Sequence, residues 1–171
     1  MRKLIIFLLF IFSFNMALAS DNWFEAKSDH FIVHYSNAPE RFINKLIDEA
    51  EYAYDRIAED LGFQRYDFWL WDNRAQIYVY DDARDYQVST GLPSWSQGAA
   101  VYAKKIIYTF PDQRNFFEKT LPHEMSHIIF REFVGFNNQA VPLWLDEGVA
   151  SLYDKSQRFT SKNIVKDAIK K

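Results

Sequence analysis

The stretch LPHEMSHIIFREF, residues 121–133, decides which fold the rest of the chain must build. Its apolar residues recur at helical spacing, as Leu121, Met125, Ile128 and Ile129 show. We therefore expect a helix with one face in the core. The same stretch carries polar residues that an apolar helix accommodates only at a cost, unless they are paired or bind a ligand.

The start of this helix is marked by three residues. The helical pattern begins near Asn115, and Pro122 is tolerated only in a first turn. We therefore expect Thr120 to be the N-cap.

Two histidines of the predicted helix, His123 and His127, are four residues apart. On a helix they project about 40° apart and about 6 Å along the axis, so both imidazoles can reach one cation. Glu124 lies to one side of the pair, where it can hydrogen-bond a water on that cation without being a ligand itself. The HExxH pattern is rare by chance, and it predicts a metal site suited to hydrolysis.

A catalytic zinc usually has three protein ligands, so a third is expected on another element. The segment PLWLDEGVASLYD, residues 142–154, predicts a second amphipathic helix from near Pro142 to about Tyr153. It offers two carboxylates, Asp146 and Glu147, the latter 20 residues after His127. Spacing alone leaves both open as the third ligand.

At LPHEMSH and WLDEGVASLYD the chain resembles the gluzincin metallopeptidases, and within them the peptidase MA-like domains. The resemblance implies an α+β, zincin-like fold, with a small mixed sheet, an active-site helix and a following ligand-bearing helix. It also implies one Zn²⁺ ion held by His123, His127 and Glu147. Glu147 is favoured over Asp146 because the family's ligand is the Glu immediately before Gly.

The resemblance further assigns Glu124 as the general base and later proton donor. Zinc lowers the pKa of the water it binds from near 16 toward about 7, so peptide-bond hydrolysis at neutral pH is expected. Asp154 matches the acid that the aminopeptidase branch places two turns after the ligand, where it orients a zinc-binding histidine. The alternative for Asp154 is a solvated acid at a helix end. The family's oxyanion-stabilising Tyr or His is not placed by a motif, and Tyr153 is the only tyrosine after Glu147.

Elsewhere the pattern predicts a strand at 30–36, an amphipathic helix at 39–62 and a strand at 75–80. Residues 99–110 predict one long strand or two short ones, after a loop at 89–98.

Three further features of the sequence allow an expectation about their place in the fold. The aromatic stretch 68–71 is expected in the core or on a covered sheet edge. Residues 98–100 are small and could form the sheet edge along which an extended substrate pairs, or an ordinary turn. His30 and His34 have no neighbouring ligand pattern and are expected on the surface of a strand.

Residues 1–19 have the pattern of a secretory signal peptide. Arg2 and Lys3 precede an apolar run at 4–14, and Ala17-Leu18-Ala19 gives a small-x-small cleavage pattern. An uncleaved membrane anchor is the alternative, but the run is shorter than the roughly 20 residues that span a bilayer. Export is expected, without stable membrane insertion after cleavage.

The remaining residues, 20–171, are expected to form one zincin-like catalytic domain. The 171-residue chain is 49% hydrophobic and can build a core without a structural metal. It has no Cys, so disulfides and thiolate ligands are excluded. Cleavage after Ala19 removes two positive charges and takes the net charge from −3 to −5, which argues against nucleic acid as a partner.

These features together predict an exported zinc metallopeptidase with a peptide or protein substrate. Its cleavage specificity and oligomeric state are not encoded in any pattern. One alternative is a non-catalytic exported protein that keeps zinc and binds peptides. Another is a hydrolase of a non-peptide amide or ester.

Overall fold

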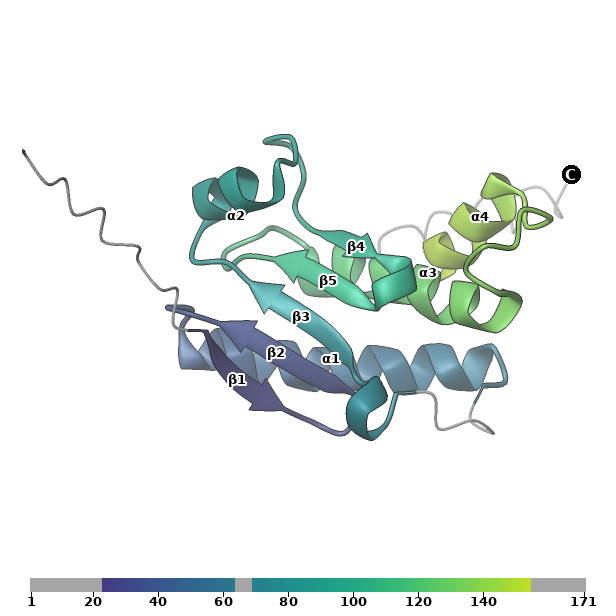
Figure 1. Cartoon of the computed structure of the whole chain (residues 1–171), viewed down its shortest axis with the longest axis horizontal. Coiled ribbons are helices and arrows are strands. Elements are labelled where there is room, and N and C mark those ends of the chain that lie inside the picture. The colour runs from purple at the N-terminus through teal and green to yellow at the C-terminus, as the bar shows by residue number, and fades with distance from the viewer. Residues whose placement is uncertain (1–22, 64–68, 155–171) are drawn as a thin grey trace, which may run out of the picture.

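A computed structural model of the protein describes residues 23–63 and 69–154. The predicted signal peptide lies outside these residues. The described part has an α+β architecture of one five-stranded mixed sheet and four α-helices (Figure 1). The α+β class and the small mixed sheet expected from the sequence are thereby confirmed.

The sheet has the strand order β1-β2-β3-β5-β4. β2 (Phe31–Tyr35), β3 (Ala75–Val79) and β5 (Ile106–Thr109) run parallel at its centre. β1 (Phe24–Lys27) and β4 (Ala99–Val101) pair antiparallel to them at the two edges. The site described below lies beside the β4 edge.

Two long helices cover one face of the sheet. α1 (Glu40–Asp60) connects β2 to β3, and α3 (Leu121–Val134) follows β5 and packs against α1 (Figure 1). The shorter α2 (Ala83–Thr90) follows β3, and α4 (Leu143–Tyr153) packs against α3. Buried apolar side chains fill the space between sheet and helices, among them Phe31, Val33, Leu46, Ile57, Ile77, Ile107, Met125 and Ile128.

The periodic segments form where the sequence predicts them. The strands at 30–36 and 75–80 and the helix at 39–62 correspond to β2, β3 and α1. Segment 99–110 forms two short strands, β4 and β5, joined by a single 3-10 turn, η2 (Tyr102–Lys104). The predicted loop at 89–98 begins two residues late, because Ser89 and Thr90 end α2.

The start of the histidine-bearing helix differs from the expectation. Pro122 lies in the first turn of α3 as predicted, but Thr120 has helical backbone angles and makes no capping hydrogen bond with its side chain. A π-helical turn, η3 (Phe116–Thr120), runs directly into α3. The predicted N-cap is therefore wrong, because the chain enters α3 from a preceding helical turn and not from an extended residue.

In both the aromatic stretch and the small-residue segment 98–100, neighbouring residues have different surroundings. Trp69 is fully buried in the core, whereas Trp71 is 79% exposed. Residues 99–100 lie on the edge strand β4. Gly98, directly before the strand, packs too closely against Thr120 to carry a side chain. A Cβ on Gly98 would lie 2.9 Å from Cγ2 of Thr120, so its bare backbone allows β4 to approach the start of α3.

Among the described residues, no helix has both the length and the apolar character needed to cross a membrane.

Candidate metal centre

The first half of α3 places the two histidines on one face of the helix. The Nε2 atoms of His123 and His127 lie 3.3 Å apart. His127 is nearly buried at 2% side-chain exposure, and His123 is a quarter exposed. The i, i+4 spacing therefore gives the convergence expected of it.

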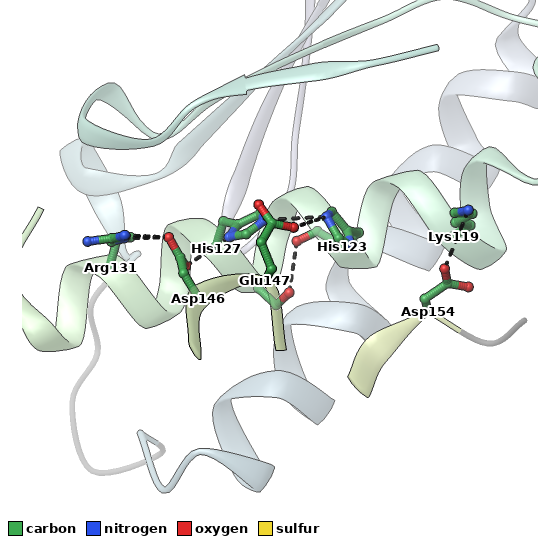
Figure 2. Close-up of polar contacts among 8 residues, drawn as sticks. Lys119, His123, His127, Arg131, Asp146, Glu147 and Asp154 are labelled. Carbon is green, nitrogen blue, oxygen red and sulfur yellow. Dashed lines mark hydrogen bonds and ion pairs between the residues drawn. The ribbon is translucent and has the colours of Figure 1, made fainter. Parts of the chain in front are cut away.

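α4 brings the carboxylate of Glu147 to the same point (Figure 2). Its Oε2 lies 3.7 Å from Nε2 of His123, and its Oε1 lies 3.8 Å from Nε2 of His127. A tetrahedral zinc with bonds of about 2.0–2.1 Å would separate its ligand atoms by about 3.3 Å, close to these distances. His123, His127 and Glu147 thus form a group that could hold a metal ion, all three donors lying within 4.8 Å of one another.

Asp146 has a different place from Glu147, its neighbour in sequence. Its Oδ1 lies 2.9 Å from Nδ1 of His127, on the side of the ring away from the other two donors (Figure 2). Arg131 donates to Oδ2 of Asp146 from Nε at 2.7 Å and from Nη2 at 2.6 Å. A carboxylate on Nδ1 fixes the proton there and leaves Nε2 free to bind a metal.

The contact with a histidine that the resemblance suggested for Asp154 is thus found between Asp146 and His127. The available signal was Arg131, which follows His127 by one helical turn and marks the position of a buried acid. That signal has meaning only when the packing of α4 on α3 is known.

Asp154 lies at the C-terminal end of α4 and is 1% exposed, so it is not a solvated acid. Its Oδ2 lies 3.7 Å from Nζ of Lys119 (Figure 2). Its negative charge also acts on His123, where it opposes the lowering of the histidine's pKa. The proposed histidine-orienting role of Asp154 therefore stays a prediction that concerns His123.

Burial lowers the pKa of His123, and the neighbouring His127 lowers it further. The neutral imidazole is the form that binds a metal, so both effects keep His123 ready for a ligand role at neutral pH.

Burial raises the pKa of Glu124 to about 7, against the opposing effects of His127 and of the nearby Tyr102 hydroxyl. A carboxyl group with a pKa near the working pH can both accept and return a proton. Glu124 is not among the three converging donors.

Tyr102 is a site residue that the sequence patterns do not identify. Its ring stacks on His127 with centroids 5.0 Å apart and planes at 29°, and burial raises the pKa of its hydroxyl. The tyrosine that follows Glu147, Tyr153, lies instead near α1, where the guanidinium of Arg56 lies over its ring. Tyr102 lies within the segment 99–110, for which the sequence predicts only strands.

A pocket of about 540 Å³ opens beside two of the three donors, His127 and Glu147. Tyr102, His127 and Glu147 contribute to its wall, and apolar side chains that include Val101 and Leu143 form much of the rest. Because Glu147 is 53% exposed, the donors can be reached from solvent.

The chain matches no model of a known protein family, and no curated protein has significant sequence similarity to it.

Proposed function

We propose that this protein is an exported, zinc-dependent metallopeptidase with a zincin-like fold, related to the gluzincins. The observation that carries the proposal is the convergence of His123, His127 and Glu147 from two packed helices. Their neutral imidazoles and single carboxylate are the donor set that zinc accepts in hydrolytic sites.

Zinc held by these three residues would supply a Lewis acid that makes water nucleophilic at neutral pH and polarises a carbonyl group. Asp146 supports this role by holding the Nδ1 proton of His127, so that Nε2 keeps its lone pair for the ion.

Glu124 is the group that moves protons. As a carboxylate it takes a proton from the attacking water, and as a carboxylic acid it gives that proton to the leaving amine when the C–N bond breaks. Its pKa of about 7 makes both forms available near neutral pH. The net reaction consumes one water and returns Glu124 to its starting form.

The substrate is a peptide or protein segment. β4 is an edge strand, and its outer backbone groups can pair with an extended chain. The adjoining pocket offers apolar walls to a side chain next to the bond that is cut.

The test compares the native protein with Glu124→Gln in a quenched peptide library, with zinc measured by elemental analysis in both. We expect hydrolysis in the native protein and at least about a 100-fold loss in the variant, as for removal of a general base. Zinc content should be equal. Glu118→Gln is the matched control, because Glu118 is an exposed glutamate on the preceding turn.

Zinc binding without hydrolysis of any peptide would contradict the peptidase proposal. Peptide binding to that zinc form would then favour the non-catalytic alternative, and cleavage of ester or amide probes would favour another hydrolase.

A further inference from the structure

Tyr102 occupies a fixed position in the turn of the β4–β5 hairpin. It begins η2, the turn between the two strands, and its backbone carbonyl accepts a hydrogen bond from the amide of Lys105 at 2.9 Å. The turn η2 packs directly against α3.

The hairpin is anchored on α3 by Lys105. Its Nζ lies 3.4 Å from Oε1 of Glu132 and donates to the carbonyl oxygen of Asn73 at 2.9 Å. Trp69 donates from Nε1 to the other oxygen of Glu132 at 2.5 Å. Because Lys105 lies three residues from Tyr102, these bonds hold the turn that carries Tyr102 in register with the helix.

From this position Tyr102 contacts one of the three converging donors. Its ring lies against the imidazole of His127, with the ring centroids 5.0 Å apart and the planes at 29°.

We infer that Tyr102 is a positioning residue, whose ring holds the imidazole of His127 in its metal-binding orientation. The inference requires metal binding but not the peptidase activity proposed above. No pattern in the sequence marks Tyr102 for this role.

Two substitutions distinguish loss of the ring from loss of the hydroxyl alone. Tyr102→Phe keeps the stacked ring and removes only the hydroxyl, whereas Tyr102→Ala removes both. Tyr108→Phe is the control, because Tyr108 also lies half-buried in the same hairpin but takes no part in the metal site.

Zinc affinity, measured by competition with a chromophoric chelator, tests the ring without any need for activity. We expect the native affinity in Tyr102→Phe and Tyr108→Phe, and a loss of about 10–100-fold in Tyr102→Ala, as for other groups that orient a metal ligand. Native affinity in Tyr102→Ala, with the fold shown intact by circular dichroism, would overturn this role of the ring.

The failures of the two proposals are distinguishable. If the native protein binds zinc but cuts no peptide, the proposed function fails while the zinc affinities still decide the role of the ring. If the native protein cuts peptides and Tyr102→Ala binds zinc with the native affinity, only the inference about the ring fails.

Discussion

The protein has four histidines in two pairs, and both pairs have the same spacing, His30 with His34 and His123 with His127. In the first pair His34 lies within β2 and His30 directly precedes it, and four residues of an extended chain span about 13 Å. The second pair lies on α3, where four residues rise only about 6 Å. Spacing therefore predicts a shared ligand only after the period of the element is known.

The two pairs also differ in how carboxylates contact them. Nδ1 of His30 lies 2.6 Å from Glu51, and Nδ1 of His34 lies 3.7 Å from Glu25, so each strand histidine has its own carboxylate. Each also stacks on a tyrosine ring. On α3, by contrast, the carboxylate of Glu147 lies near both imidazoles, which is an arrangement that a cation stabilises.

The largest expected effect is on zinc content. His123→Ala and His127→Ala should each abolish stoichiometric zinc binding, because two donors remain of three. His30→Ala and His34→Ala should bind one zinc per chain, like the native protein. Elemental analysis after gel filtration checks this, and zinc retained in His127→Ala or lost from a folded His34→Ala would reverse the comparison.

The next effect concerns the carboxylate that contacts one histidine of each pair, Asp146 at His127 and Glu51 at His30. Asp146→Asn should weaken zinc binding by about 10–100-fold, because the amide is a weaker acceptor for the Nδ1 proton of His127. Glu51→Gln, the equivalent change at His30, should leave zinc affinity unchanged. Competition with a chelator measures both, and equal affinity in Asp146→Asn and the native protein would show that the Asp146 contact is dispensable.

The metal-free protein should be less stable in alkaline solution because of Glu124. Its folded-state pKa of about 7 lies above the ordinary 4.5, so its contribution is fully present below pH 4.5 and is lost as pH rises through 7. The loss is at most about 3 kcal/mol. Urea unfolding in the presence of EDTA at pH 5 and pH 8 measures it. Glu124→Gln should lack this component, and an identical pH dependence in both proteins would contradict the assignment.

Glu51 should respond in the opposite direction. Burial raises its pKa, but hydrogen bonds that include those from His30 outweigh this effect, and the net pKa is lowered below 4.5. Its contribution is therefore present above pH 4.5 and is lost as pH falls through the folded-state pKa. Glu51→Gln should cost about 1 kcal/mol in the free energy of unfolding at pH 7, with normal zinc content. A stable variant with altered zinc content would contradict the separation of the two histidine pairs.

Much of the fold follows from periodicity in the sequence. β2, β3 and α1 bury a regular set of apolar residues, and this pattern is sufficient to predict them. β1 and α2 were not predicted. β1 has four residues, none of them fully buried, and α2 buries only Tyr86, so neither has a pattern long enough to detect. For α2 the signals were local, an N-cap at Asp82 and a left-handed C-cap at Gly91.

Part of the candidate site could be predicted from the sequence, and part could not. The convergence of His123 and His127 follows from the helical period, and the resemblance to the gluzincins implies the place of Glu147. The positions of Asp146 and Tyr102 depend on how α4 and the β4–β5 hairpin pack on α3, which no pattern within one segment encodes. Contacts between distant elements are therefore the part of the site that periodicity and spacing do not predict.

The most direct test is a crystal structure of the zinc-loaded protein, with the ion located by its anomalous scattering. The expected result is one zinc bonded to Nε2 of His123, Nε2 of His127 and a carboxylate oxygen of Glu147, at about 2.0–2.2 Å. Zinc bound by Asp146 in place of Glu147, or zinc found only at His30 or His34, would contradict the central claim.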